Sequence, residues 1–260
     1  MYDLASIQAA LSDTVFARKL HYSESTGSTN DDALRAARAG APNGSVYVAN
    51  EQTAGRGRGD HEWHSVAGEG LYASVLLRPA IPASRLPLLP LAAGLAAADA
   101  IHTTAGLAVD LRWPNDLLIG PRKTGGILVE SHIEAGFVAF VVIGIGINVH
   151  QHAFAADLAT PATSLDLESH AAVSRRELLV ALLKSLQREV LALRDREAGQ
   201  TIPRRVESNS TWVRGRRVEV HGPQACAGVT DGLDEHGFLR VGTAGGVVTV
   251  QTGGLRAVAD

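Results

Sequence analysis

Three apolar runs in the middle of the chain constrain its fold more than any other feature. They are LAVDLRWPNDLLI at 107–119, GGILVES at 125–131 and FVAFVVIGIGINV at 137–149. Each is rich in β-branched residues, and Pro, Asn, Asp and Gly separate them, as is typical of buried strands joined by turns. We therefore expect these runs to form neighbouring strands of one mixed sheet.

Two further strands are expected on either side of a basic loop. SVYVAN begins at Ser45 and LYASVLLRP begins at Leu71, and both have the apolar, β-branched character of strands. Between them lies EQTAGRGRGDHEWHS, residues 51–65, which places three glycines and two arginines on five consecutive positions. We call residues 51–65 the basic loop, and we predict that it connects two strands.

A short helix is predicted within GSTNDDALRAARAG, residues 27–40. Asn30 can cap this helix, Asp31 and Asp32 favour the positive end of its dipole, and Gly40 can end it. The helix would follow directly on a polar turn.

Two longer helices are predicted further along the chain. An alanine-rich apolar pattern from Ser84 indicates a buried helix. Ser174 and Glu177 form a capping box ahead of ELLVALLKSLQREVLALRD, whose periodicity predicts an amphipathic helix of about 19 residues. We expect this second helix to belong to the core rather than to a functional site.

The sequence pattern changes after Pro203. The short β-type runs RRVEV, GVTDGL, GFLRV and GGVVTV follow, with glycines at roughly regular intervals and Asp-Gly and His-Gly turn pairs. A small all-β module is therefore expected from about Ser210.

Charge and cysteine content limit the partners and the compartment. The net charge of −3 and the pI near 6.4 provide no global basic field, so we expect no binding of nucleic acid. Cys226 is the only cysteine, which excludes an internal disulfide and any multi-cysteine metal site. The N-terminal segment lacks the features of a secretion signal, and no stretch approaches about 18 uncharged apolar residues. We expect a cytoplasmic protein with no membrane segment.

Common nucleotide and metal motifs do not fit the sequence. A P-loop ending at Lys123-Thr124 would need glycine where Arg122 stands, and a dinucleotide fingerprint in the basic loop would need glycine at Asp60. HEWHS departs from the zinc signature His-Glu-x-x-His because Ser65 holds the second histidine position.

Anion recognition is the remaining interpretation of the basic loop. Arg56 and Arg58 can each offer a planar fork of donors to phosphate or carboxylate. Gly55, Gly57 and Gly59 expose backbone N–H groups and permit positive φ angles. Composition alone fits a solvated hairpin tip as well as a loop that closes over an anion.

Five motifs then occur in order along the first part of the chain. They are GSTN at 27–30, AGRGR at 54–58 followed by Trp63, RWPND at 112–116, KTGGILVE at 123–130 and GIGINV at 144–149. Together they resemble the motifs of the biotin protein ligases, also called biotin–[acetyl-CoA-carboxylase] ligases, over roughly residues 25–150.

Two positions depart from the pattern of that family. Arg112 stands where the family usually has lysine before Trp-Pro-Asn-Asp, which keeps the positive charge. Asp60 and His61 stand near the end of the basic loop in place of the usual glycine and arginine. The second departure removes an arginine at position 61, while Arg56 and Arg58 stay in register.

The resemblance implies an α+β fold. A mixed β-sheet with helices packed on one face would form a catalytic domain over residues 1–208. A small C-terminal SH3-like β-barrel would follow over residues 209–260.

The resemblance also implies an ATP-dependent ligase with two half-reactions. The biotin carboxylate would attack the α-phosphate of ATP to give biotinyl-5′-AMP, and a lysine of a biotin carboxyl carrier protein would then take the biotinyl group. Biotin and ATP would be the substrates, Mg²⁺ would arrive with ATP rather than on protein ligands alone, and a homodimer is compatible with the family.

Two alternatives stay open. A lipoate–protein ligase shares the fold of the family. A biotin-responsive regulator adds a DNA-binding domain ahead of the catalytic domain, but only about 25 residues precede GSTN, which we expect to be too few for that module.

The resemblance assigns roles to individual residues. The implied catalytic residues are Lys123, Arg56, Arg58 and Asp116. The implied biotin-binding residues are Ser28, Thr29, Asn30, Gln52, Arg56, Gly57, Arg58, Lys123 and Gly126. The residues implied for ATP and the adenylate are Arg56, Arg58, Trp63, Asn115, Asp116, Lys123 and Asn148. Trp63 would stack on adenine, and Asp116 could hold Mg²⁺, orient Lys123 or assist deprotonation of the acceptor lysine.

Overall fold

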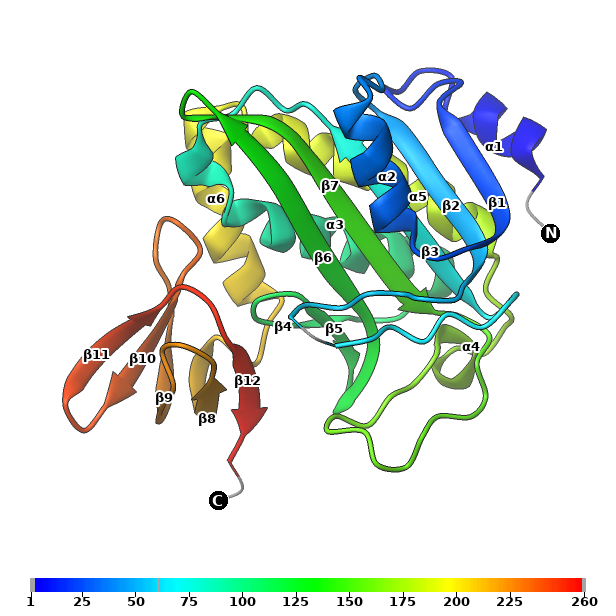
Figure 1. Ribbon diagram of the computed structural model, residues 1–260. Coiled ribbons are helices and arrows are strands. Elements are labelled where there is room, and N and C mark those ends of the chain that lie inside the picture. Colours follow the sequence, from blue (N-terminus) through cyan, green and yellow to red (C-terminus); the bar gives the residue numbers. More distant parts are fainter. Residues whose placement is uncertain (1–2, 60, 259–260) are drawn as a thin grey trace.

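The computed structural model describes residues 3–59 and 61–258, and a seven-stranded sheet runs through its larger part (Figure 1). The strand order is β1-β2-β3-β7-β6-β5-β4, in which β1 and β2 are parallel and all other neighbours are antiparallel. The strands are β1 (Leu20–Thr26), β2 (Ser45–Gln52), β3 (Gly70–Leu77), β4 (Asp110–Arg112), β5 (Asp116–Ile119), β6 (Arg122–Glu134) and β7 (Phe137–Asn148). The predicted mixed sheet is therefore confirmed, and the basic loop does connect two of its strands, β2 and β3.

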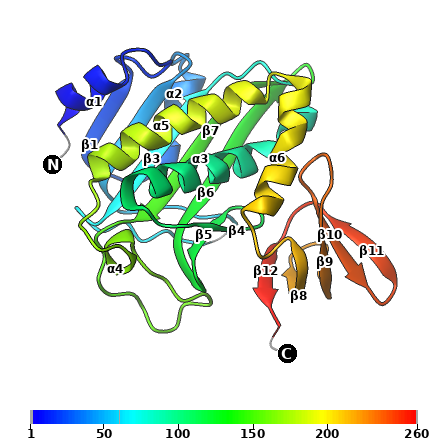
Figure 2. The ribbon, with the colours of Figure 1, turned by 180° about the vertical axis from the view of Figure 1, so that it is seen from behind.

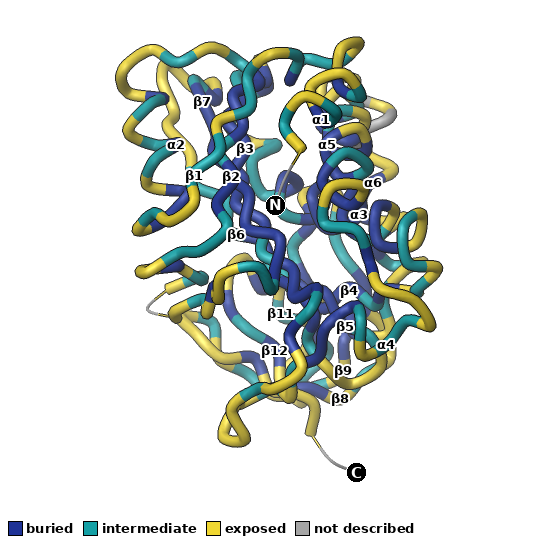
Figure 3. The backbone as a smooth tube through the Cα atoms, turned by 90° about the vertical axis from the view of Figure 1, so that its right-hand side faces the viewer, coloured by how far each residue is buried: buried dark blue, intermediate teal, exposed yellow. Residues whose placement is uncertain are grey.

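The long hairpin of β6 and β7 lies near the centre of this sheet. Its register pairs Ile127 with Ile145 and Gly126 with Gly146. Because side chains alternate along a strand, Ile145 faces the main core while Val142 faces the opposite side. Figure 3 shows that buried residues follow the strands of the sheet.

Three helices cover one face of the sheet. α3 (Leu88–Ala105) and α5 (Arg175–Ala192) lie across this face, and α6 (Arg196–Ser208) packs on α3 (Figure 2). α3 is long and apolar enough to span a membrane, but most of it is buried, and it packs against α5 and the sheet. Burial on several sides explains why α3 is apolar around its whole circumference.

One helix lies on the other face, so the helices are not confined to one side as expected. α2 (Thr29–Arg38) packs Ala33 and Ala37 against Leu76 and Val142. α2 thus covers part of the sheet face that lies opposite α3 and α5 (Figure 1).

The N-terminal cap of α2 also differs from the prediction. Ser28 holds the extended N-cap position, and Asn30 lies inside the first turn. The buried side chain of Asn30 bonds Ser74 and Glu130, so this residue fastens α2 to the sheet instead of capping it. Gly40 follows the helix with a φ of 87°, a conformation that favours glycine.

The predicted amphipathic helix is confirmed, whereas the expected change to β-type structure directly after Pro203 is wrong. α5 begins after Ser174, whose hydroxyl accepts a hydrogen bond from the Glu177 N–H. α6 contains Pro203 and continues past it. Ile202 is fully buried, and the stability gained from this packing outweighs the cost of a proline inside a helix.

Short helical segments complete the larger part of the chain. They are α1 (Leu4–Ala10), α4 (Leu165–Glu168) and a single 3₁₀ turn (Ala83–Arg85). α1 was not expected from the sequence, and it places the buried Ile7 in the main core.

A second sheet follows α6. Its five antiparallel strands have the order β11-β10-β9-β8-β12 (lower left of Figure 1). They are β8 (Arg214–His221), β9 (Cys226–Leu233), β10 (Leu239–Thr243), β11 (Gly246–Val250) and β12 (Gly254–Ala257). The α+β fold class with a small C-terminal β domain is therefore confirmed, although β11 and β12 do not pair within the described residues, which leaves the sheet open. The domain boundary between residues 208 and 209 stays a prediction, and α6 ends at this point.

Candidate active site

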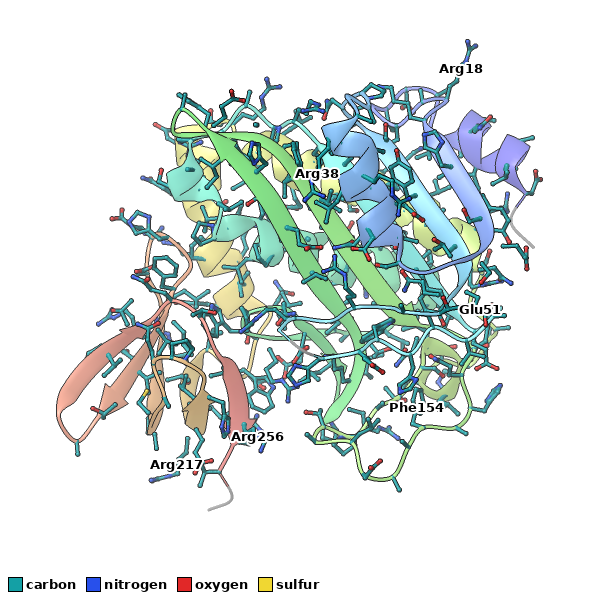
Figure 4. The ribbon with its side chains drawn as sticks, viewed as in Figure 1. Arg18, Arg38, Glu51, Phe154, Arg217 and Arg256 are labelled. Atoms are coloured by element: carbon teal, nitrogen blue, oxygen red, sulfur yellow. The ribbon has the colours of Figure 1, made fainter. Side chains whose placement is uncertain are left out.

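A cleft of about 730 Å³ lies where the basic loop, the hairpin of β6 and β7 and the C-terminal sheet meet. All predicted site residues line it: Ser28, Thr29, Asn30, Gln52, Arg56, Gly57, Arg58, Trp63, Asn115, Asp116, Lys123, Gly126 and Asn148. Phe154, on the loop after β7, and Arg256, on β12, also line the cleft, and Figure 4 shows them on two sides of the lower part of the molecule.

One end of the cleft is polar and uncharged. The side-chain oxygen of Gln52 accepts from the backbone N–H of Thr29 at 2.8 Å, and its amide nitrogen donates to Ser65 Oγ at 2.7 Å. The hydroxyls of Thr29 and Ser74 lie 2.7 Å apart, and Ser74 donates to Asn30 Oδ1 at 2.6 Å. These hydrogen bonds hold the uncharged donors and acceptors of the network in fixed orientations. The network therefore suits a neutral ligand group that forms several directed hydrogen bonds.

The basic loop crosses β6 and β7 (cyan in Figure 1), and its arginines already have partners. Arg56 Nη2 lies 2.6 Å from Glu130 Oε2 and 2.8 Å from Asp31 Oδ1. Arg58 Nη2 donates to the carbonyl of Gly253 in the C-terminal sheet domain at 2.5 Å. An anion that enters the cleft must therefore compete with two carboxylates for Arg56, and with the Gly253 carbonyl and the Asn115 side-chain oxygen for Arg58.

The glycines of the basic loop serve different purposes. Gly59 has a φ of 63°, which favours glycine, whereas Gly55 and Gly57 do not have positive φ angles. A side chain at Gly55 would strike the carbonyl of Trp63, so this glycine is needed for close packing within the loop. Asp60, one of the two departures from the family pattern, lies outside the described residues.

The indole of Trp63 lies over the floor of the cleft. Lys123 Nζ is 5.6 Å from the ring centroid, and a Cβ added at Gly146 would come within 2.5 Å of the indole. The indole Nε1 is buried and has no hydrogen-bond partner among the described residues. An acceptor on a bound molecule would satisfy this N–H, which otherwise costs about 1–3 kcal/mol.

A carboxylate between two cations forms the charged centre of the cleft. Asp116 Oδ1 lies 2.6 Å from Lys123 Nζ, and Asp116 Oδ2 accepts from Arg112 Nε and Nη2 at 3.0 and 2.7 Å. Burial alone would raise the pKa of the Asp116 carboxyl, but Lys123 and Arg112 together hold this pKa below its usual range. Asp116 is therefore ionised, and both its oxygens are engaged.

The backbone holds Lys123 firmly in place. Lys123 pairs with Leu118 on β5, its N–H donates to the carbonyl of Pro161, and its carbonyl accepts from Thr163. The ammonium group lies on a flexible stem above this fixed point, and Asp116 determines where it points.

Two of the predicted site amides, Asn115 and Asn148, brace the walls of the cleft. Asn115 Nδ2 donates to the carbonyl of Ile127 at 2.7 Å, and Asn148 Nδ2 donates to the carbonyl of Thr163 at 3.0 Å. Asn115 Oδ1 also accepts from Arg58 Nη1 at 3.4 Å. Each amide thus joins a strand to a neighbouring segment.

Sequence reasoning missed several residues that complete the site. Glu130 ends the KTGGILVE motif but carried no assigned role, and Asp31 was interpreted only as a partner of the helix dipole. Ser74 and Thr160 gave no signal, because a serine inside an apolar strand and a threonine in a loop are ordinary. Only the fold brings Ser74 and Thr160 to the cleft, and Asp31 and Glu130 to Arg56.

The chain matches the Biotin/lipoate A/B protein ligase family over residues 22–148. It is 35% identical to the biotin--[acetyl-CoA-carboxylase] ligase of Mycobacterium tuberculosis, over 91% of this chain and 88% of that relative. The structure of a biotin protein ligase from Aquifex aeolicus in complex with biotin and ATP superimposes with a TM-score of 0.79 at 28% identity, and covers 93% of this chain and 100% of that chain. The chain belongs to the biotin protein ligase family.

Other relatives are longer than this chain. The bifunctional ligase/repressor BirA of Bacillus subtilis is 40% identical over 181 residues, which are 69% of this chain and 56% of that relative. The chain therefore spans little more than half the length of the Bacillus ligase/repressors that it matches.

Proposed function

We propose that this protein activates biotin with ATP as biotinyl-5′-AMP and transfers the biotinyl group to a lysine of a biotin carboxyl carrier domain. The observation that carries the proposal is the Lys123–Asp116 pair, which stands between an uncharged hydrogen-bonding pocket and a basic loop in one cleft. Relatives named biotin--[acetyl-CoA-carboxylase] ligase and a neighbour that binds biotin and ATP support it.

In the first half-reaction a biotin carboxylate oxygen attacks the α-phosphorus of ATP, and pyrophosphate leaves. Carboxylate and triphosphate are both anions, so their approach requires local positive charge. Lys123 is the cation with a flexible stem at the centre of the cleft, and it would bridge the carboxylate and the α-phosphate. Asp116 would orient the Lys123 ammonium. Both oxygens of Asp116 already bind cationic side chains, which favours this role over holding Mg²⁺ or deprotonating the acceptor lysine.

The uncharged end of the cleft would hold the ureido head of biotin. Ser28, Thr29, Asn30 and Gln52 provide hydroxyl and amide groups there, and these can bond a neutral group without an unpaired charge. Gly126 lies beside the charged centre, since a Cβ there would come into ordinary contact with Lys123 and Trp63.

The other end of the cleft would hold the nucleotide. The indole of Trp63 offers a face to adenine, and Asn115 and Asn148 line the same space. Arg56 would leave its present carboxylate partners, and Arg56 and Gly57 would then contact the biotin carboxylate. Arg58 would likewise leave the carbonyl of Gly253. The basic loop would thus close over the adenylate.

In the second half-reaction the amine of the acceptor lysine attacks the acyl carbon, and AMP leaves with the former carboxylate oxygen. Lys123 would stabilise the charge that develops on AMP. The excess proton passes from the acceptor amine to solvent or to a group in the cleft.

Mg²⁺ would arrive with ATP. No group of three His, Cys, Asp or Glu side chains suited to a metal ion occurs within residues 3–59 and 61–258, and Asp116 has no free oxygen. The donor set therefore fits a cation held mainly by phosphate oxygens, whose charge it would offset.

The remaining expectations follow from the same proposal. The partners would be biotin, ATP and the carrier domain of a biotin-dependent carboxylase, without nucleic acid or membrane, and the location would be the cytoplasm. A homodimer stays compatible with the proposal.

Biotin should support pyrophosphate release, whereas lipoate should not. The measurement is pyrophosphate formed from ATP and Mg²⁺ by the purified protein with each acid in turn, and omission of both acids is the control. Equal or faster release with lipoate would replace the proposed function with lipoate ligation, the alternative that the shared fold allows.

A further inference from the structure

The C-terminal domain contacts the charged centre through one aromatic ring. Trp212 lies just before β8 and is buried, and the guanidinium of Arg112 lies over its ring at 5.1 Å from the centroid. Trp212 does not line the cleft. Any effect of Trp212 on the reaction must therefore pass through another residue.

A continuous chain of contacts runs from this ring to the reactive cation. Arg112 holds Asp116 Oδ2 through two donors, and Asp116 Oδ1 holds Lys123 Nζ at 2.6 Å. Arg112 also donates to Thr160 Oγ1 at 3.0 Å. These hydrogen bonds lie in the plane of the guanidinium, and an indole packed over its face adds a restraint on tilting of that plane.

The position of Trp212 is itself fixed by the segment before it. Thr211 bonds the Asp110 carboxylate through its N–H at 2.8 Å and through its hydroxyl at 2.6 Å. Ser210 Oγ donates to the carbonyl of Leu111, and the Trp212 N–H donates to Ser210 Oγ at 3.1 Å. The start of the C-terminal domain is thus bonded to β4, the strand that ends in Arg112.

We propose that Trp212 is a positioning residue for the ligase reaction, and that the C-terminal domain sets the place of the Lys123 ammonium through Trp212, Arg112 and Asp116. The inference rests on the proposed function. Without the indole, the Arg112 fork can rotate away from Asp116, and Asp116 no longer fixes Lys123. A displacement of about 1 Å at a reacting group can cost up to a hundredfold in rate, so a smaller loosening should cost about tenfold.

The test is a double-mutant cycle in biotinyl-adenylate formation. Trp212→Leu keeps apolar volume but removes the aromatic face, and it should lower kcat about tenfold while biotin affinity, measured by calorimetry, changes less than about twofold. Trp212→Phe keeps a smaller ring and should lower kcat by only about threefold. In an Arg112→Lys background, where the fork is absent, Trp212→Leu should have little further effect.

Arg216→Met is the matched control. Arg216 lies over the same indole at 4.0 Å but has no contact with Asp116, so its loss should leave kcat within about twofold. If Trp212→Leu does not fold, the same cycle with Trp212→Phe should show a loss of about threefold that disappears in the Arg112→Lys background.

Two results would overturn the inference. One is a wild-type kcat in Trp212→Leu. The other is an equal loss in both backgrounds, which would mean that Trp212 acts through general packing rather than through Arg112. Failure of the proposed function gives a different result, because the wild-type protein itself would then release no pyrophosphate with biotin.

Discussion

Lys123→Ala is expected to slow biotinyl-adenylate formation about a hundredfold, which corresponds to about 3 kcal/mol of lost transition-state stabilisation. The reason is electrostatic: the variant leaves two anions to meet in a cleft where Arg56 and Arg112 already hold carboxylates and Arg58 holds the carbonyl of Gly253. Lys123→Arg should rescue only part of the rate, because a planar fork cannot occupy the point between Asp116 and the phosphate. Single-turnover formation of the adenylate measures this step.

The second half-reaction of Lys123→Ala can be measured separately with biotinyl-5′-AMP prepared in advance. Transfer to the carrier should also slow, because the same cation stabilises the AMP that leaves. Lys184→Ala, on the exposed side of α5, is the matched control and should keep both rates. If both steps survive in a folded Lys123→Ala protein, the assignment of Lys123 is wrong.

Asp116→Asn is expected to lower the free energy of unfolding by about 3 kcal/mol at pH 7. The side chain of Asp116 is only 16% exposed, and its charge balances Arg112, which is buried. Without that charge, two cations face each other across a largely buried space. Urea unfolding should show the loss, and Asp231→Asn, which removes the carboxylate of exposed ion pairs, should cost less than about 1 kcal/mol.

The contribution of Asp116 should also depend on pH in one direction. Because its pKa is lower in the folded protein, its contribution is complete above the unfolded pKa of about 3.9 and is lost as pH falls through the folded pKa. The stability difference between wild type and Asp116→Asn should therefore shrink below about pH 4. A difference that is the same at pH 7 and at pH 3 would show that the carboxylate is not held by these cations.

The parts of the fold that local sequence determines were predictable. The β-branched runs gave the strands, and Ser174 gave the start of α5, because burial and capping act within a few residues. α6 was not predictable, since the packing of Ile202 in the core overrides the local preference of Pro203. Asn30 was mistaken for a helix cap for the same kind of reason, because its partners Ser74 and Glu130 lie on distant strands.

The candidate site also contains some residues that the sequence predicts and some contacts that only the folded chain creates. Lys123 and the arginines of the basic loop could be found from motifs, and the structure brings them into one cleft. Their present partners could not be found, because Glu130 and Gly253 reach Arg56 and Arg58 only through the folded chain. The sequence gives no sign at all of the role of Trp212. An aromatic residue before a β-rich segment does not indicate contact with Arg112, the partner of Asp116, which lies far away in the sequence.

The central claim is that the carboxylate of biotin attacks the α-phosphorus of ATP in this cleft. Biotin labelled with ¹⁸O in both carboxylate oxygens tests it directly, with mass spectrometry of the nucleotide and phosphate products after transfer to a carrier domain. The proposed reaction leaves one labelled oxygen in AMP, because aminolysis at the acyl carbon releases AMP with the bridging oxygen, and the pyrophosphate carries no label. Unlabelled AMP, or ADP together with labelled phosphate, would contradict the proposed reaction.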